Sequence, residues 1–263
     1  MDIIVCIKQV PDTTDVKIDP KTGTLVREGV PSIVNPDDKH AVEEALRLKE
    51  SYGGKVTAIS MGPPQAVAAL REVYAMGVDE TILLSDRAFA GADTWATSYT
   101  LATAIKKIGK YDIIFCGLQA IDGDTAQIGP QLAEALGIPQ ITYVQKLEVQ
   151  GKKVRAERAL ENGYMVLETE IPVLLTAIKS LNEPRYPTVG GIVKAHREHQ
   201  VKIWTAKDIG ADPKKIGLQG SPTQVKRSFA PQPKRAAEII EGKSVQEKVK
   251  KLVDRLEERN VVR

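Results

Sequence analysis

Cysteine, histidine and aromatic residues are scarce in this chain of 263 residues, and each shortage excludes a class of chemistry. The chain has 2 cysteines and 3 histidines, and 5% of its residues are aromatic. Cys6 and Cys116 form no Cys-x-x-Cys pair, so we expect two buried, reduced thiols. His196 and His199 lie in a charged segment, which predicts a solvated helix face and no metal site. The side chains therefore offer little redox or hydrolytic chemistry of their own.

Long apolar runs, strong charge of one sign and the common phosphate motifs are also missing. No segment approaches the roughly 20 apolar residues of a membrane span, and the first residues lack a signal-peptide pattern, so we expect a cytoplasmic location. The net charge of +3 is thinly spread, so no nucleic-acid-binding stripe is indicated. Neither Gly-x-Gly-x-x-Gly nor a P-loop occurs. No Ser-Gly-Gly-x-Asp loop follows the first predicted strand, which disfavours an ATP-cleaving ligase.

Short apolar runs alternate with helical patterns through the first half of the chain. The pattern predicts strands at residues 2–8, 55–60, 80–84 and 111–116, and helices at 37–52, 65–76 and 94–108. Such alternation is typical of an α/β fold with right-handed crossovers. We expect a three-layer, open, mostly parallel sheet of Rossmann-like, adenine nucleotide-binding type.

Two regions depart from this alternation. Residues 11–36 form an insertion with a predicted hairpin at 16–27, which could cover a ligand or meet a partner. Later, consecutive strands are predicted at residues 142–149, 152–160, 164–170 and 172–177. We interpret them as antiparallel additions to the same sheet, with two separate domains as the less favoured alternative.

The chain changes composition again from about residue 201. The segment is rich in Lys, Gly, Pro and Gln and cannot build a core of its own. A closing helix, Ser244 to about Arg259, carries apolar residues on one side: Val245, Val249, Leu252, Val253 and Leu256. We therefore expect a nucleotide-binding α/β domain over residues 1–200, and over 201–263 a C-terminal arm whose helix docks on a partner subunit.

The stretch Gly117–Gly129, called here the nucleotide loop, is the most informative segment. It follows a buried strand, carries small and hydrogen-bonding residues, and opens a helix that Asp124 or Thr125 could cap and Gly137 would end. Free amides and the helix dipole would favour a phosphate there. Asp122 and Asp124 would repel a phosphate, so we expect them to cap the helix or to bind ribose hydroxyls.

Other loops follow strands that should end at the same edge of the sheet, where ligands of open parallel sheets bind. They begin at Cys6, at Asn35 and at Met61. Asn35 before Pro36 fits a helix cap and a ligand contact equally well, and Met61 fits a tight turn or a packing contact with adenine. Residues 85–94 could be an exposed loop in which Asp93 or Thr94 caps the following helix. Alternatively, this loop could lie beside the extra ring of a larger ligand.

The chain resembles the beta (small) subunit of electron transfer flavoproteins, including FixA-type and electron-bifurcating members. Three motifs carry the resemblance: Val34-Asn35-Pro36 leading into residues 41–50, the segment 119–129, and Leu181-Asn182-Glu183-Pro184-Arg185-Tyr186. Each is weak alone, but together in this order they are specific. The resemblance covers essentially the whole chain.

The resemblance implies a heterodimer with a larger alpha subunit that holds an electron-carrying FAD. The beta subunit binds an adenine nucleotide: AMP in ordinary members, or in bifurcating members a second FAD that accepts a hydride from NADH. No catalytic residue and no metal ligand is expected. The expected cofactor-binding residues are Cys6, Asn35, Pro36, Asp37, Asp38, Met61, Gly117, Leu118, Gln119, Ala120, Ile121, Asp122, Gly123, Asp124, Thr125, Ala126, Gln127, Ile128 and Gly129.

Two segments resemble the bifurcating kind more than the ordinary kind. Residues 86–94 are similar to the loop of anaerobe-type members, and residues 119–127 resemble theirs instead of the Asp-rich ordinary version. We therefore favour FAD over AMP as the bound nucleotide. We expect NADH to be the electron donor. The expected flavin-side or NADH-side residues are Arg87, Phe89, Ala90, Gly91, Asp93 and Thr94.

The partner of this subunit is less clearly indicated. Residues 185–194 match the loop with which ordinary members grip acyl-CoA dehydrogenases, and Arg185, Tyr186 and Val189 are the expected contacts. Val189 stands where Leu is usual, and Ala159 replaces an acidic residue that pairs with the alpha subunit in ordinary members. Another flavin dehydrogenase or a quinone-reducing complex therefore stays open as the partner. A stress-type nucleotide-sensing module is the alternative function, although it gives no reason for the basic arm, and an adenylating enzyme comes third.

Overall fold

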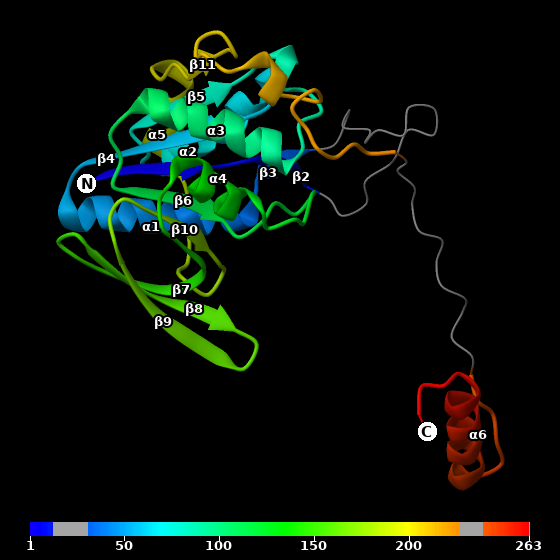
Figure 1. The fold of residues 1–263 in the computed structure, drawn as a ribbon. Helices are drawn as coiled ribbons and strands as arrows, with labels where there is room; N and C mark the ends of the chain where they lie inside the picture. Colours follow the sequence, from blue (N-terminus) through cyan, green and yellow to red (C-terminus); the bar gives the residue numbers. More distant parts are fainter. Residues whose placement is uncertain (13–30, 227–238, 263) are drawn as a thin grey trace. The chain divides into compact units, whose positions relative to one another are not determined.

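The structure, a computed structural model, describes residues 1–12, 31–226 and 239–262 (Figure 1). The hairpin expected within residues 16–27 lies outside the described residues. The chain divides into two compact units, Met1–Arg227 and Ser228–Arg263. Each unit is described by itself.

In the described part of the first unit, one 9-stranded sheet has the order β11-β5-β4-β1-β6-β10-β7-β8-β9. Neighbours from β11 to β7 are parallel, and β8 and β9 add antiparallel to β7, which confirms the α/β class. The strands are β1 (Asp2–Cys6), β4 (Lys55–Met61), β5 (Glu80–Leu84), β6 (Ile113–Gly117), β7 (Gln140–Gln150), β8 (Lys153–Leu160), β9 (Gly163–Glu170), β10 (Val173–Ala177) and β11 (Lys202–Trp204). A separate antiparallel ladder joins β2 (Gln9–Pro11) to β3 (Ser32–Val34).

The expectation that β10 is an antiparallel addition was wrong. β10 lies between β6 and β7 and is parallel to both, with Leu174 opposite Ile114 on one side and Gln140 on the other. Its five residues are all buried, as a central parallel strand requires. The sheet turns antiparallel only beyond β7, whose register shifts after Val144 and whose Tyr143 has a φ of 58°.

Helices cover both faces of the sheet (Figure 1). One face packs against α1 (Pro36–Tyr52) and α2 (Val67–Met76), and α5 (Val189–Arg197) lies against α2. The opposite face packs against α3 (Thr94–Ile108) and α4 (Ile128–Leu136). The molecule thus has the predicted three layers. Short 3-10 helices occur at Pro64–Ala66, Arg87–Phe89 and Pro213–Lys215.

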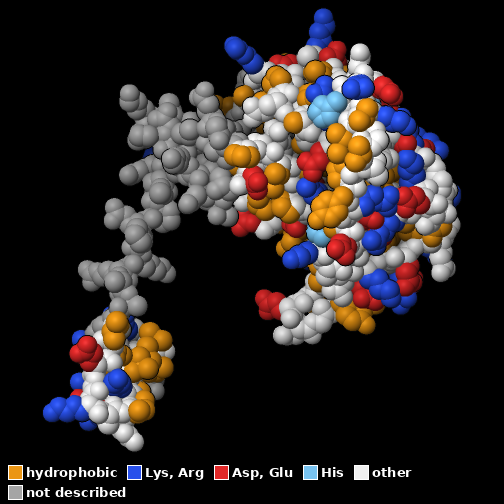
Figure 2. Space-filling view, turned by 180° about the vertical axis from the view of Figure 1, so that it is seen from behind, with side chains coloured by type: hydrophobic (Ala, Val, Ile, Leu, Met, Phe, Trp, Pro, Cys, Tyr) orange, Lys and Arg blue, Asp and Glu red, His pale blue; other side chains and the backbone are white. Residues whose placement is uncertain are grey.

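The compact first unit continues past residue 200, where we expected the arm to begin. β11 joins the edge of the sheet parallel to β5, and Ile209 and Ile216 are buried in the core beside α3. The unit therefore ends at Arg227. In the second unit, α6 (Val245–Glu258) begins after Ser244, whose side chain accepts a hydrogen bond from the Glu247 amide. Its apolar side chains gather along one side of the helix, and all of them except Leu256 are exposed (Figure 2).

Candidate functional site

The carboxyl ends of β1, β4 and β6 meet at one edge of the sheet. Cys6 is in register with Ile59 on one neighbouring strand and with Cys116 on the other. Met61 and Gly117, which end β4 and β6, therefore lie at the same edge as Cys6. The structure thus brings the predicted strand ends together, and Cys6 and Cys116 are both free and buried, as expected.

Asn35 joins the start of α1 to the nucleotide loop. Its side-chain amide donates to the Gln119 carbonyl at 2.8 Å, and its Oδ1 accepts from the Ile121 amide at 3.1 Å. The residue is fully buried and makes no side-chain capping bond to α1. The helix-cap interpretation was therefore wrong: Pro36 begins the helix as predicted, but Asn35 anchors the loop main chain.

Asp38 anchors the end of two strands. Its Oδ2 accepts from the Lys8 amide at 2.7 Å and its Oδ1 accepts from the Gly117 amide at 3.1 Å. Burial raises the pKa of this carboxyl to about 7, although these two hydrogen bonds act in the opposite direction. A Cβ atom on Gly117 would lie 2.3 Å from Oδ1 of Asp38, so the glycine is needed for this close approach. Asp37 is half-buried, and burial raises its pKa against a hydrogen bond from the Gln119 main chain.

Both acidic residues of the nucleotide loop have partners within the protein, but only Asp122 is paired with a positive charge. Asp122 forms an ion pair with Lys8 at 2.7 Å, and Asp124 accepts a hydrogen bond from the Gln119 side chain. The expectation that Asp124 or Thr125 caps α4 was wrong. The helix begins later, at Ile128, after Gln127, and no side chain caps its first turn. No side chain therefore satisfies the first amides of this helix, those of Ile128 and Gly129.

Between Leu118 and Gln127 the loop is half-buried to exposed, and its backbone has an unusual shape. Asp124 and Ala126 have φ values of 53° and 52°, in the left-handed region that non-glycine residues rarely adopt. Leu118 is tied to β10 by a hydrogen bond from its amide to the Ala177 carbonyl at 2.9 Å. An exposed segment that is held in a strained backbone shape is typical of a ligand site.

The other two glycines of this loop, Gly123 and Gly129, have different roles. A Cβ atom on Gly129 would lie 2.5 Å from Cγ2 of the buried Thr176 on β10, so this glycine is required by packing. A Cβ atom on Gly123 would have no atom within 4 Å. Gly123 is therefore the position where an added side chain would enter open space at the loop.

The loop before α3 has its own internal contacts. Phe89 is buried in the core, and the Asp93 carboxylate caps α3 by accepting from the Ala96 amide at 3.0 Å. Thr94 Oγ1 donates to Oε1 of Gln127 at 2.8 Å, which joins this loop to the nucleotide loop. Of the residues expected to face a flavin or NADH, Phe89, Asp93 and Thr94 thus have their side chains engaged within the protein.

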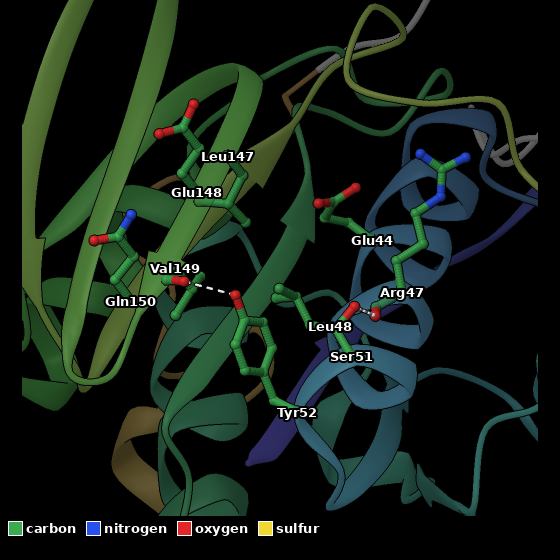
Figure 3. A pocket seen from close by; sticks show the side chains of 9 residues that line it. All are labelled: Glu44, Arg47, Leu48, Ser51, Tyr52, Leu147, Glu148, Val149 and Gln150. Carbon is green, nitrogen blue, oxygen red and sulfur yellow. Dashed lines mark hydrogen bonds between the residues drawn. The ribbon is translucent and has the colours of Figure 1, made fainter.

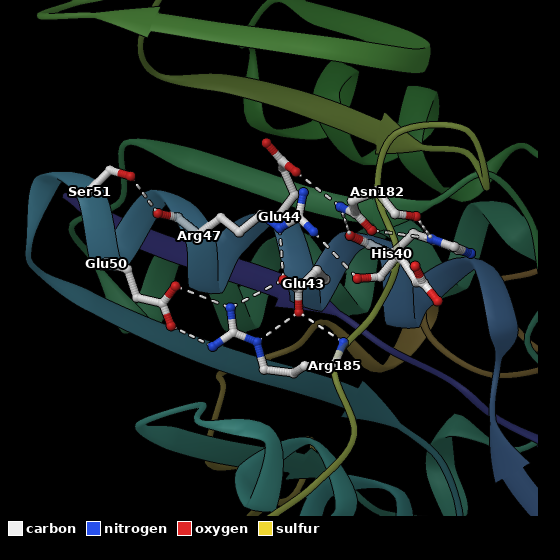
Figure 4. A network of polar contacts seen from close by, with 9 residues as sticks. His40, Glu43, Glu44, Arg47, Glu50, Ser51, Asn182 and Arg185 are labelled. Carbon is white, nitrogen blue, oxygen red and sulfur yellow. Dashed lines mark hydrogen bonds and ion pairs between the residues drawn. The ribbon is translucent and has the colours of Figure 1, made fainter.

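The segment Leu181–Tyr186 lies along α1 (Figure 4). Arg185 forms ion pairs with Glu43, at 2.8 Å from Nε to Oε2, and with Glu50. Burial acts to raise the pKa of Glu43, but the bonds from Arg185 and Arg47 outweigh it and lower the pKa. Asn182 donates to the His40 carbonyl at 3.0 Å and to Glu44 at 2.9 Å. The guanidinium of Arg185, an expected partner contact, is therefore occupied within the chain.

Tyr186 and Val189, the other expected partner contacts, are 91% and 80% exposed. Ile192 and Val193 on α5 are exposed as well, and α5 approaches α2 closely through Gly191. Hydrophobic side chains are scattered over the face turned away in Figure 1 (Figure 2). The expectation that His199 lies on a solvated helix face was wrong. Its ring stacks on Tyr74 and its Nε2 lies 2.7 Å from Oγ1 of Thr81.

Sequence reasoning missed a hollow between α1 and β7 (Figure 3). The Tyr52 hydroxyl closes one side of it by donating to the Val149 carbonyl at 2.6 Å. The hollow is lined by Glu44, Arg47, Leu48, Ser51, Tyr52, Leu147, Glu148, Val149 and Gln150, none of them an expected cofactor residue. The hollow depends on the approach of α1 to β7, two elements that lie far apart in the chain.

Comparison with known proteins decides the family. The family model described as "Electron transfer flavoprotein domain" matches residues 22–209. The chain belongs to the electron transfer flavoprotein family. This confirms the resemblance in the Asn35, Gln119 and Leu181 motifs.

The relatives named here match the chain over 88% to 100% of its length. It is 60% identical to the electron transfer flavoprotein subunit beta of Thermoanaerobacterium thermosaccharolyticum, covering 100% of both chains. It is 55% identical, again covering 100% of both chains, to the caffeyl-CoA reductase-Etf complex subunit CarD of Acetobacterium woodii. It is 49% identical to protein FixA of Azorhizobium caulinodans, over 88% of this chain and 85% of that one. The role of an electron transfer flavoprotein beta subunit is thus supported.

Two further properties concern the described ranges of this family member. In them, no helix is long and apolar enough to cross a bilayer. Over the same ranges, His, Cys, Asp and Glu side chains form no group of three or more that could hold a metal ion.

Proposed function

We propose that this beta subunit holds an adenine nucleotide at the carboxyl edge of its sheet and passes electrons only within a complex. The observation that carries the proposal is the nucleotide loop: it is partly exposed, and buried Asn35 and Asp38 bind its main chain at Gln119, Ile121 and Gly117. Such anchoring fixes the amides in place and costs little reorganisation when a ligand binds.

Three features of this edge fit a nucleotide. The first turn of α4 has no side-chain cap, and its dipole favours a phosphate group. Gly123 faces open space. Oγ of Ser60, at the end of β4, is buried without a hydrogen-bond partner in the described structure. We propose that the strand ends at Cys6 and Met61 hold the adenosine end and that the loop amides hold the phosphates, while Lys8 offsets the charge of Asp122.

We further propose FAD as this nucleotide, with AMP as the alternative. A bound FAD would supply two-electron chemistry and accept a hydride from NADH. The similarity to a subunit named for a caffeyl-CoA reductase-Etf complex supports the bifurcating type. Residues of this chain would bind and orient the cofactor, because none of the described side chains at the edge is a redox group other than the buried thiols of Cys6 and Cys116.

The proposed partners are a flavin-bearing alpha subunit and a dehydrogenase or quinone-reducing complex, in the cytoplasm. The edge strand β9 exposes Tyr164, Met165 and Val166 together with one row of backbone groups, a surface that is usually covered. The exposed apolar side of α6 supports docking of the arm on the alpha subunit. Tyr186 and Val189 support a dehydrogenase contact.

The test is the cofactor count of the complex purified with its large subunit. Two FAD per heterodimer would support bifurcation, and one FAD with one AMP would support the ordinary carrier. A complex that holds bound ATP and no flavin would contradict the proposal and favour the nucleotide-sensing module.

Gly123→Asp tests the location of the site. The added carboxylate enters open space, so the protein should fold normally while repelling phosphate. The affinity for the nucleotide should fall at least about tenfold, and the nucleotide count should fall with it. Gly123→Ala is the matched control and should keep its nucleotide. Full retention in the Asp variant would place the phosphates elsewhere.

A further inference from the structure

The loop before α3 packs against a segment near the end of the first unit and hydrogen-bonds to it. We call residues 217–223 the arm root (orange in Figure 1). The Leu218 amide donates to the Ala90 carbonyl at 3.1 Å, and a Cβ atom on Gly217 would lie 2.1 Å from the Ala88 carbonyl oxygen. The arm root is therefore closely fitted to residues 88–93.

Asp93 binds the arm root and the start of α3 at once. Its Oδ2 accepts from the Thr223 amide at 3.0 Å and from the Thr223 hydroxyl at 2.8 Å. Its Oδ1 accepts from the Ala96 amide as the N-cap of α3, and its own amide donates to Oγ of Ser221 at 2.8 Å. Hydrogen bonds to a carboxylate are among the stronger ones, so this contact fixes the arm root where it meets α3.

The next residue continues the connection to the nucleotide loop. Thr94 donates to Oε1 of Gln127, the residue directly before α4, and Ser98 donates to Gln131 one turn further at 3.3 Å. Asp93 and Thr94 are neighbours at the first turn of α3. A shift of Asp93 therefore moves the group that holds the Gln127 side chain.

We propose that Asp93 is a positioning residue that couples the arm root to the nucleotide loop, so that the nucleotide is held more tightly while Thr223 is bound to Asp93. The inference rests on the proposed function, because it requires a nucleotide at this loop. Linkage between two sites is reciprocal. A partner that pulls the arm root away from Asp93 therefore lowers the affinity for the nucleotide, and bound nucleotide lowers the affinity for that partner by the same factor.

The experiment compares Thr223→Val with Thr223→Ser in the full-length chain bound to its large subunit. Val removes the hydroxyl donor and keeps the shape, whereas Ser keeps the donor. AMP and FAD are the probes, their dissociation constants are measured by titration, and hydrogen exchange of the amides at residues 119–127 is measured in parallel. Thr94→Val, alone and combined with Thr223→Val, interrupts the connection at its second bond.

We expect Thr223→Val to raise the dissociation constant about fivefold and to speed loop exchange, and Thr223→Ser to behave like the wild type. In the Thr94→Val background, Thr223→Val should add little. Unchanged loop exchange in Thr223→Val, or effects of the two Val variants that add fully, would overturn the coupling. Wild-type protein that binds neither probe would instead refute the proposed function, and the exchange data would still decide the coupling.

Discussion

The two ends of α1 hold two irregular segments in different ways. At its start, the short, buried side chains of Asn35 and Asp38 bind main-chain groups of the nucleotide loop. Further along, Glu43 and Glu50 bind the long side chain of Arg185, which is 33% exposed. The first arrangement fixes a backbone and leaves the loop's side chains exposed, whereas the second uses a side chain to hold a segment and leaves its neighbour Tyr186 free.

The largest effect should come from filling the space at Gly129. Gly129→Ala brings a Cβ atom against Cγ2 of Thr176, and overpacking of this kind costs about 3 kcal/mol. Chemical denaturation measures the loss. Thr176→Ser removes Cγ2 and keeps the hydroxyl that binds the Tyr143 amide, so the double variant should regain much of the stability. A double variant as unstable as Gly129→Ala alone would mean that packing on Thr176 is not the reason for the glycine.

Asn35→Ala should come next. The change removes both bonds to the nucleotide loop and leaves a buried cavity, at a cost of about 2 kcal/mol in unfolding free energy. The loop amides should also exchange faster, and the nucleotide count should fall. Asn35→Asp is the control, because it keeps the acceptor for the Ile121 amide but loses the donor to Gln119. If the loop exchanges no faster in Asn35→Ala, the anchoring described above is unimportant.

Asp38 should make stability depend on pH. Its pKa is raised by burial to about 7 in the folded state, above its value in the unfolded chain. Its contribution is therefore fully present below the unfolded pKa and is lost as pH rises towards 7, with a slope of at most about 1.4 kcal/mol per pH unit. Unfolding curves from pH 4 to 8 for wild type and Asp38→Asn isolate this term. The difference between the two proteins should change with pH over that range; a constant difference would rule out the raised pKa.

The smallest effect is expected at Arg185. Arg185→Ala breaks half-exposed ion pairs, so it should lower the unfolding free energy by only about 1 kcal/mol and speed amide exchange at residues 181–186. The nucleotide loop should be unaffected, which separates the two ends of α1. Arg185→Lys keeps the charge but loses the bidentate geometry, so its unfolding free energy and its exchange rates should lie between those of the wild type and Arg185→Ala. Equal exchange in all three proteins would show that Arg185 does not hold the segment.

Much of the first half of the fold could be predicted because its signals are local. Thr94–Ile108 was predicted with its observed bounds, and the convergence of Cys6, Met61 and Gly117 followed from parallel strand ends. The errors fall where another hydrogen-bond partner competes with the local capping rule. Asn35 looked like a cap, but its partners lie 84 and 86 residues away. Asp124 looked like a cap as well, but it binds Gln119 instead.

The amino-acid sequence by itself determined the α/β class, the family and the set of loops at one edge of the sheet, because periodicity and motif order are properties of neighbouring residues. Only the tertiary structure decided what each polar residue does there. Asn35 and Asp38 hold the nucleotide loop, and Asp93 holds Thr223, through hydrogen bonds between segments far apart in the chain. The position of β10, and with it the need for glycine at residue 129, depended in the same way on long-range packing.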